Sequence, residues 1–270
     1  MKMKFLKKYM MVEVVGLSIV LGNGLLQAPA STSDFQGPRY SKDRLEAEAE
    51  FEPIFNGKDL TGWEYDPVYW SVKDGAIVGE ITPETVLKNN TFIIWKGGEV
   101  GDFELKLDYW ISEVGNSGIQ YRSDRFTEVP YALRGYQADI DAANRYTGQN
   151  YEERKRTTLA YRGQKTEISA QPDGTDVRGY VERNAWKGLH VTEELGDREA
   201  MGNLIKKGEW NSIHLIIKGN VMQHYVNGTL MSEVHDEDEK NRMLSGLLGM
   251  QVHVGPPMMV KFKDIQLKKL

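Results

Sequence analysis

The sequence predicts an all-β protein, a sandwich of two antiparallel sheets that carries a long polar excursion. Apolar and polar residues alternate over many short segments, which is the pattern of half-buried strands. Turn residues separate these segments at close spacing, and long helical periodicity is absent. Short strands with turn signals between them are typical of an antiparallel sandwich.

The first 30 residues have the pattern of a secretory signal peptide. A basic start, MKMKFLKKYM, precedes an apolar run from Met10 to Leu26, and Ala28-Pro29-Ala30 carries the small residues of a cleavage site. The alternative is a membrane anchor, but the run is short for a span and Glu13 interrupts it. We therefore expect cleavage, no stable membrane span after processing, and a periplasmic or secreted bacterial protein.

Composition narrows the function classes further. The chain has no cysteine, which excludes disulfides, a thiolate nucleophile and cysteine-ligated zinc. After removal of residues 1–30, the sequence retains 30 basic and 38 acidic residues, a formal charge of −8. No basic block stands out, so nucleic acid is not an expected partner.

We expect one globular domain, a β-sandwich over residues 51–270, after a polar segment at 31–50. In chain order, the clearest alternating segments are TFIIW (91–95), FELKLDYWI (103–111), SIHLIIK (212–218), VMQHYV (221–226) and MVKFKDIQL (259–267). Gly219-Asn220 and Asn227-Gly228 are expected hairpin turns, because these residues tolerate a positive φ.

The stretch from about 142 to 208 differs from the rest because it is polar and highly charged. We interpret it as a long excursion with a few short strands, and not as a second core. Long ordered excursions often cover a binding site. The alternative, decoration at the edge of the sandwich, fits the sequence equally well.

Three further strands predict a candidate site, because each pairs an apolar face with an unusually polar one. The segments are SGIQYRS (117–123), YQADID (136–141) and MQVHV (250–254). Their polar faces carry Gln120, Arg122, Gln137, Asp139, Asp141, Gln251 and His253. Amide, carboxylate, guanidinium and imidazole groups suit hydrogen bonding to sugar hydroxyls, and titratable ones can transfer protons.

Simpler readings exist for single members of this set. Arg122 with Asp139 or Asp141 is also compatible with a surface ion pair. Asp139 and Asp141, with His253 or His190 from the excursion, form a weak signature of a divalent-cation site. The sequence contains no glycine-rich phosphate loop, nucleophile elbow or HExxH motif.

At these residues the chain resembles the 3-keto-disaccharide hydrolase domain family. The resemblance rests on six segments in order: FNGKDLTGWE (55–64), WSVKDGAIVGE (70–80), GDFELKLDYWISEVGNSGIQYRS (101–123), GYQADID (135–141), GEWNSIHLIIKGNVMQHYVNG (208–228) and GLLGMQVHVGPPMMVKFKDIQLKK (246–269). They cover essentially all of residues 51–270. Two departures are Val252, where members often have Asp, and Met258-Met259, which fill a turn that is usually shorter.

The resemblance implies a concanavalin A-like jelly roll whose concave face binds sugar. It implies an exported hydrolase, a glycosidase of carbohydrate metabolism that cleaves 3-keto glycosides by abstraction of the C2 proton, elimination and hydration. On this interpretation His253 acts as base or acid. Arg122, or a cation held by Asp139 and Asp141, stabilises the enolate.

Substrate-binding residues follow from the same interpretation: Gln120, Gln137, Gln251, Asn116 and His190. The fold also hosts lectins, and fold alone does not determine function. The alternative hypothesis is therefore a non-catalytic carbohydrate-binding module.

Overall fold

A computed structural model describes residues 51–172, 174–182 and 186–270. The expected signal peptide, residues 1–30, and the polar segment 31–50 lie outside the described residues. Within the described ranges, no helix is long and apolar enough to cross a membrane.

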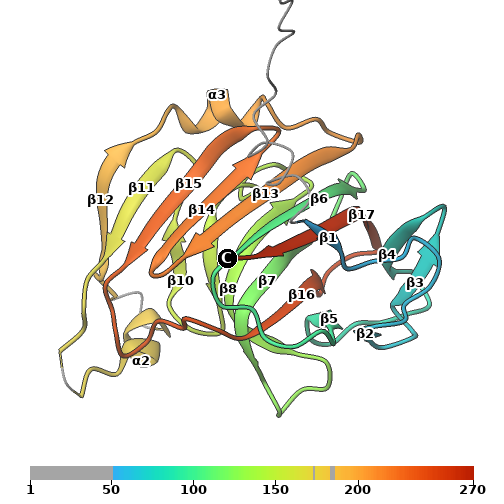
Figure 1. Ribbon diagram of the computed structural model, residues 1–270, viewed down its shortest axis with the longest axis horizontal. Helices are drawn as coiled ribbons and strands as arrows, with labels where there is room; N and C mark the ends of the chain where they lie inside the picture. Colours follow the sequence, from blue (N-terminus) through green and yellow to red (C-terminus); the bar gives the residue numbers. More distant parts are fainter. Residues whose placement is uncertain (1–50, 173, 183–185) are drawn as a thin grey trace, which may run out of the picture. The chain divides into compact units, whose positions relative to one another are not determined.

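The described residues form two β-sheets that pack face to face (Figure 1). We call the smaller one, with seven described strands, the front sheet. Its spatial order is β10 (Thr157–Ala160), β9 (Asn150–Glu153), β8 (Leu133–Asp141), β7 (Asn116–Arg125), β16 (Leu247–Val252), β5 (Thr91–Trp95) and β2 (Trp63–Glu64).

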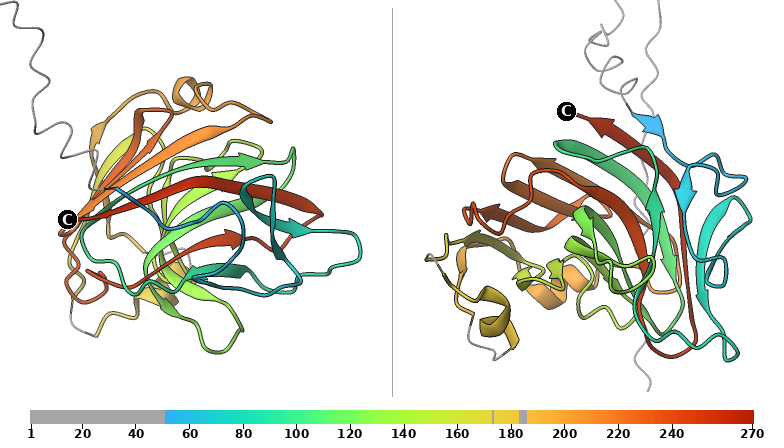
Figure 2. Two further views of the ribbon diagram at one scale, coloured as in Figure 1. Left: turned by 45° about the vertical axis from the view of Figure 1, so that its right-hand side comes forward. Right: turned by 90° about the horizontal axis from the view of Figure 1, so that it is seen from below.

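The larger sheet, called the back sheet, has ten strands in the described part of the chain. Its order is β12 (Leu189–Glu194), β11 (Gln164–Ile168), β15 (Thr229–Asp236), β14 (Val221–Val226), β13 (Asn211–Lys218), β6 (Phe103–Ile111), β17 (Met258–Lys269), β4 (Ala76–Ile81) and β3 (Trp70–Lys73), and β1 (Glu52–Pro53) pairs with β17. The long strands β6 and β17 lie side by side and curve together (Figure 2). The two-sheet, all-β prediction is confirmed.

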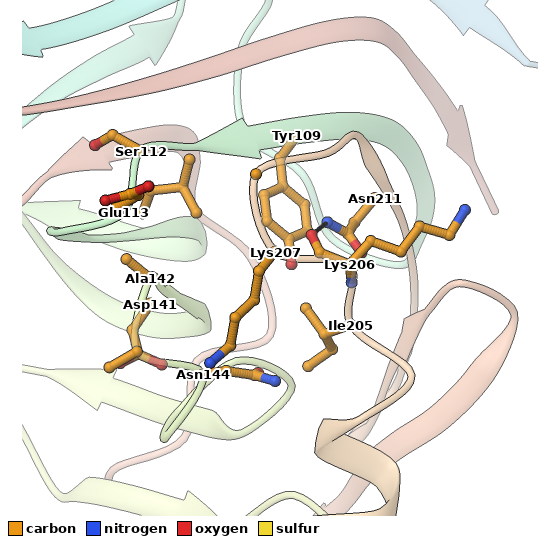
Figure 3. Close-up of a pocket in the computed structure, with 13 residues that line it drawn as sticks. Tyr109, Ser112, Glu113, Asp141, Ala142, Asn144, Ile205, Lys206, Lys207 and Asn211 are labelled. Carbon is orange, nitrogen blue, oxygen red and sulfur yellow. Dashed lines mark hydrogen bonds between the residues drawn. The ribbon is translucent and has the colours of Figure 1, made fainter.

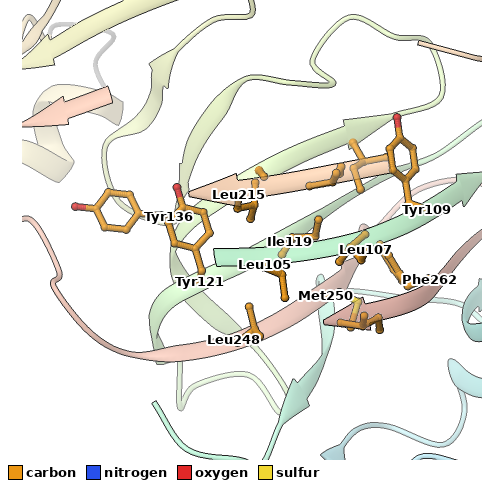
Figure 4. Close-up of a cluster of buried hydrophobic side chains, with 14 of the residues drawn as sticks. Leu105, Leu107, Tyr109, Ile119, Tyr121, Tyr136, Leu215, Leu248, Met250 and Phe262 are labelled. Carbon is orange, nitrogen blue, oxygen red and sulfur yellow. The ribbon is translucent and has the colours of Figure 1, made fainter. Parts of the chain in front are cut away.

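Alternation places the expected residues in the core between the sheets. Ile119 and Tyr121 of β7 and Tyr136 of β8 are buried there in one cluster with Leu105 and Leu215 of the back sheet (Figure 4). The rings of Tyr121 and Tyr136 stack with centroids 5.7 Å apart. The same alternation turns the polar residues of β7 and β8 to the outer face of the front sheet.

The predicted turns differ in outcome. Gly219, Asn227 and Gly228 all have positive φ and join β13, β14 and β15 as tight hairpins, as predicted. Met258 and Met259 were expected in a turn, but they begin β17 and pair with Ile81 and Glu80.

The excursion, residues 142–208, extends both sheets and does not build a separate core. It supplies β9 and β10 to the front sheet and β11 and β12 to the back sheet. Helices α2 (Val177–Glu182) and α3 (Arg198–Gly202) lie in its connections. Because the chain returns from β10 to the back sheet, β11 runs parallel to β15, whereas every other described strand pair is antiparallel.

Candidate functional site

The register of the front sheet arranges the predicted polar residues in rows on its outer face. Gln120 of β7 lies opposite Gln137 of β8, and Gly118 lies opposite Asp139. The amide of His253, the first residue after β16, donates to the carbonyl of Asn116. Polar groups from three strands therefore converge on a small area.

A cavity of about 360 Å³ opens over this area, and we call it the central cavity. Its lining comes from four front-sheet strands and the adjoining loops: Asn116, Gln137, Asp139, Tyr146, Gln149, Tyr151, Glu153, Thr158, Tyr161 and His253. Its size and mixed polar and aromatic lining suit a sugar ring. The excursion contributes six of these ten residues, so it lines the site as well as widening the sheets.

Asp139 lies in the wall of the central cavity with only 6% of its surface exposed. Gln137 Nε2 donates to one carboxyl oxygen at 2.6 Å, and Gln149 Nε2 donates to the other at 2.5 Å. Burial raises the pKa of this carboxyl to about 7, even though the two amides favour the charged form. A carboxyl with this pKa can both accept and donate a proton near neutral pH.

The imidazole of His253 is a second group in the central cavity whose position suits proton transfer. Its Nδ1 lies 2.7 Å from the carbonyl oxygen of Val254. A carbonyl only accepts, so Nδ1 carries the hydrogen and Nε2 of the neutral ring is left as an acceptor. His253 can therefore act as a base in the cavity that Asp139 also lines.

The central cavity belongs to a longer groove. A cavity of about 470 Å³ shares Tyr151, Glu153 and His253 with it, and a cavity of about 320 Å³ shares Asn116, Tyr146 and His253. His253 thus lies where all three cavities meet. A ligand longer than one sugar ring fits along this groove.

The outer face of the front sheet is concave at one end. Asn90 Nδ2, just before β5, donates to Glu153 Oε1 on β9, although β16, β7 and β8 lie between these strands. The loop before β5 and strand β9 therefore meet over the outer face of the front sheet. Burial raises the pKa of the Glu153 carboxyl, and burial raises the pKa of Tyr151 to about 12, so that hydroxyl stays protonated.

The structure places Gln120 and Gln251 on the expected face but buries both completely. Gln120 Nε2 donates to the carbonyl of Gly135, and neither residue lines a described cavity of the groove. His190 lies elsewhere: it is an exposed residue of β12, at the edge of the back sheet, paired with Glu167. Of the expected substrate-binding residues, Asn116 and Gln137 line the central cavity.

Arg122 does not share the polar face, contrary to the alternation of its sequence. Its φ of 42° and the register shift after Tyr121 mark a bulge in β7. The guanidinium binds Asp102 at 2.8 Å and the carbonyl oxygens of Gly101 and Gly219, which belong to back-sheet connections. Because the bulge reverses the side-chain direction, Arg122 ties the two sheets together away from the groove.

Asp141 does not line the central cavity, although it and Asp139 lie on alternate positions of β8. Asp141 ends the strand, and its carboxylate accepts the backbone amide of Tyr146 in the following turn. It lines the end of the groove and a neighbouring cavity of about 360 Å³ (Figure 3). Lys207 points into that neighbouring cavity on the side of Asn144.

This arrangement does not fit a cation held by Asp139 and Asp141. Both oxygens of Asp139 face amide N–H donors, and Asp141 accepts from a backbone amide. Among the described residues, no group of three or more His, Asp or Glu side chains is placed to hold a metal ion.

Sequence reasoning missed Gln149, Tyr151 and Glu153. A usable signal was present, because Tyr151 and Glu153 alternate with Asn150 and Glu152 in the NYEE segment of β9. This alternation does not appear as a pattern of apolar and polar residues, because the inward-facing Asn150 and Glu152 are themselves polar. Asn150 donates to the Tyr121 hydroxyl, and Glu152 binds Arg156 inside the sandwich.

Solved structures with the same fold include a protein from Parabacteroides distasonis that is provisionally described as a glycosyl hydrolase. It has a TM-score of 0.52 and 21% identity, over 84% of this chain and 96% of that one. A Bacillus subtilis protein of unknown function with a galectin-like fold has a TM-score of 0.51 and 11% identity, over 81% and 94% of the two chains. Identities this low show the fold alone.

No curated protein matches the chain significantly. The family model of the 3-keto-alpha-glucoside-1,2-lyase-like domain matches residues 50–268, which is most of the chain and all of its sandwich except the last residue of β17. Five of the six sequence segments that suggested this family lie inside the matched range, and the sixth extends one residue beyond it. The chain therefore belongs to the 3-keto-alpha-glucoside-1,2-lyase-like family.

Proposed function

We propose that this protein is an exported enzyme that cleaves 3-keto glycosides or disaccharides. Its family supports a carbohydrate-acting function. The observation that carries the finer proposal is that a sugar-sized cavity is lined both by the buried Asp139 carboxyl, whose pKa burial raises to about 7, and by His253, whose Nδ1 faces a carbonyl oxygen. This pair can move protons at neutral pH without the two opposed carboxylates of an ordinary glycosidase.

The reaction follows from the chemistry of a ketone at C3, which acidifies the hydrogen at C2. A base removes that hydrogen as a proton, and its electron pair forms the enolate. The enolate then re-forms the ketone, a C1=C2 double bond conjugated to it appears, and the bond between C1 and the glycosidic oxygen breaks. The departing oxygen takes up a proton. Addition of water across this bond puts a hydroxyl at C1 and a hydrogen at C2, so the net result is hydrolysis.

Roles for the cavity residues follow from their protonation and position. Ionised Asp139 or neutral His253 takes the C2 proton, and the other group protonates the leaving oxygen. Tyr151, which keeps its hydrogen because of its raised pKa, donates to the enolate oxygen. Asn116 and Gln137 orient sugar hydroxyls, and Tyr151 takes the enolate-stabilising role that the sequence had suggested for Arg122.

The alternative function is a lectin-like carbohydrate-binding module. The observation that favours it is a pair of partly exposed aromatic residues at the cavity rim, Tyr146 at 38% and Tyr161 at 37%. Aromatic faces at the edge of a groove bind sugar rings without any chemistry. A module of this kind has no use for a proton-transfer pair.

Product analysis separates the two functions. The purified protein is incubated with a 3-keto disaccharide and with its unoxidised parent, each with and without chelator, and products are identified by NMR and mass spectrometry. We expect cleavage of the keto sugar only, and loss of at least a hundredfold in kcat with Asp139→Asn or His253→Gln. Saturable binding of both sugars without cleavage would support the module. Loss of cleavage with chelator would restore the cation proposed for Asp139 and Asp141.

Export is proposed from the sequence of residues 1–30. N-terminal sequencing of protein expressed in a bacterium, after separation of periplasm and medium from cells, tests it. We expect the mature chain to begin at Ser31, directly after Ala30. An intact Met1 on a protein retained in the membrane fraction would indicate an anchor.

A further inference from the structure

Besides the three cavities of the groove, another cavity adjoins the central cavity on the side of the excursion, and we call it the fourth cavity. Its volume is about 590 Å³, and Tyr146 and Tyr161 line both cavities. A ligand whose reacting ring lies beside Asp139 therefore reaches the fourth cavity by passing over these two tyrosines. The rest of its wall is formed by three arginines, Arg145, Arg162 and Arg198, together with Asn144, Asp197 and Glu199.

Two of these arginines are held against the tyrosine rings. The guanidinium carbon of Arg198 lies 4.6 Å from the centre of the Tyr161 ring, and that of Arg145 lies 5.5 Å from the Tyr146 ring. Arg198 also donates to the carbonyl of Arg145 at 2.8 Å. Stacking on aromatic faces reduces the freedom of a guanidinium and leaves its N–H edge available to an anion.

The positive charge of the fourth cavity is poorly compensated. Arg198 forms no ion pair with any carboxylate in the described part of the chain, and the Arg145 guanidinium lies 4.0 Å from Asp141. Arg162 is 5% exposed and donates to the carbonyls of Arg198, Thr147 and Asn144. Carbonyl groups do not neutralise the charge of the buried Arg162 guanidinium, so this charge makes the electrostatic potential in the cavity more positive.

The two acidic residues of the wall do not cancel this field. The side chain of Asp197 accepts the backbone amide of Ala200 and caps α3. Glu199 is exposed and forms no ion pair with the three arginines. The three guanidinium groups thus face two carboxylates of the wall, one of which caps the helix, and Asp141 approaches Arg145 only to 4.0 Å.

We propose that the fourth cavity is a subsite for an anionic group, a carboxylate or a sulfate ester, carried on the part of the glycoside beyond the cleaved bond. Arg145 and Arg198 bind the anion. Arg162, through its hydrogen bonds to the carbonyls of Asn144, Thr147 and Arg198, holds the chain around these two arginines in place and adds its own positive charge. This inference rests on the proposed cleavage of keto glycosides and names the class of leaving group. Preferred substrates are therefore glycosides of acidic sugars or acidic alcohols.

The test compares 3-keto glucosides that differ only in the charge of the leaving group. The 4-carboxyphenyl and 4-sulfooxyphenyl glucosides are the anionic substrates, and the 4-carbamoylphenyl glucoside is the neutral one. We expect Arg198→Gln and Arg145→Gln each to reduce the ratio of kcat/KM, anionic over neutral, by about tenfold. Raising the salt concentration should reduce the same ratio for the unaltered protein.

Lys73→Gln is the matched control, because it removes an exposed cation on β3 in the back sheet, outside every described cavity. It should leave the ratio unchanged. A ratio that neither arginine substitution alters would overturn the subsite while leaving the cleavage proposal intact. If only one of the two anionic glucosides shows the effect, it identifies which anion the subsite accepts.

A second measurement is independent of cleavage. The unoxidised 4-carboxyphenyl and 4-carbamoylphenyl glucosides lack the ketone, so their binding is measured by calorimetry. We expect tighter binding of the carboxylate, lost in Arg198→Gln. That result with no turnover of any keto glucoside would keep the anion subsite and reject the proposed function. Equal binding of the two glucosides, in a protein that does cleave keto sugars, would reject the subsite alone.

Discussion

The properties of Asp139 come from its immediate neighbours. Gly118, opposite it on β7, has no side chain, and a Cβ there would lie 2.5 Å from Gln137 Cγ and Cδ. This space lets Gln137 lie across β7 and donate to Asp139 from one side, while Gln149 donates from the other. The carboxyl is thereby held in one orientation in a site where burial resists its ionisation.

Replacing Asp139 by asparagine should stabilise the fold at high pH. The folded protein holds the Asp139 proton up to about pH 7, whereas the unfolded chain releases it near its ordinary pKa of about 4. Between these values the native state binds more protons, so this group lowers stability as pH rises. A shift of about three pH units corresponds to roughly 4 kcal/mol as an upper bound.

Chemical denaturation of the two proteins at pH 4, 6 and 8 checks this. The stability gained by Asp139→Asn should be small at pH 4, grow up to about pH 7 and then level off. A gain that does not depend on pH would show that the carboxyl titrates normally. The same carboxyl should make kcat/KM on the keto substrate rise with pH toward 7 when it acts as the base.

Gly118→Ala tests the contact with Gln137. The added methyl group displaces Gln137 from Asp139, because the close atoms are the middle of that side chain. We expect a tenfold or greater loss of kcat, a shifted pH profile and about 1–3 kcal/mol of overpacking cost. Gly101→Ala controls for the loss of a glycine, because φ there is not positive and the nearest atom to an added Cβ lies 3.6 Å away. An unchanged pH profile in Gly118→Ala would argue against the positioning role of Gln137.

At the scale of the element, the bulge in β7 decides which residues reach the groove. The strand alternates regularly up to Tyr121, and the positive φ of Arg122 then reverses the side-chain direction. The opposite strand β16 adjusts with a register shift between Leu247 and Gly249. The backbone strain at Arg122 is offset by the hydrogen bonds of its guanidinium, which joins the front sheet to two connections of the back sheet.

Arg122→Met should therefore damage stability and not chemistry. Removing the guanidinium leaves the carbonyl oxygens of Gly101 and Gly219 without their donor, at a cost of roughly 2–4 kcal/mol. Arg134→Met is the matched control, because its ion pair with Asp124 is exposed and contributes about 1 kcal/mol or less. Denaturant melts and kcat on the folded variants measure both effects. Normal stability with abolished turnover would assign Arg122 to catalysis after all.

At the scale of the whole molecule, the two sheets are joined by a polar network as well as an apolar core. Arg156, at 1% exposure, binds Glu152 at 2.6 Å and Asp236 at 2.7 Å, and Asp238 lies at 3.6 Å. The Tyr136 hydroxyl donates to Asp236 from β8. The excursion thus attaches to β15 through charges that water does not reach.

Arg156→Met should be among the most destabilising substitutions in the protein. It leaves carboxylates buried without their cation, which typically costs about 3–5 kcal/mol. The double variant Arg156→Met with Glu152→Gln should recover part of that loss, because one uncompensated charge is removed. Thermal melts measure both variants. A loss below 1 kcal/mol for the single change would show that water enters the network and screens the charges.

The sequence alone determined the sandwich, its strands and its family. Alternation and turn chemistry depend on neighbouring residues, so they could be read directly from segments such as FELKLDYWI and from Asn227-Gly228. Alternation also put Asp139 and Gln137 on the same face, and the structure brings them together in the central cavity with His253.

The tertiary structure decided what those residues can do. The direction of Arg122 depends on a bulge that pairs with two other strands, and the separation of Asp141 depends on the turn that follows β8. Tyr151 and Glu153 reach the site because the excursion adds β9 beside β8, where Tyr151 pairs with Gln137. The pKa of Asp139 is raised by burial, which arises from segments distant in sequence, so no local pattern could predict it.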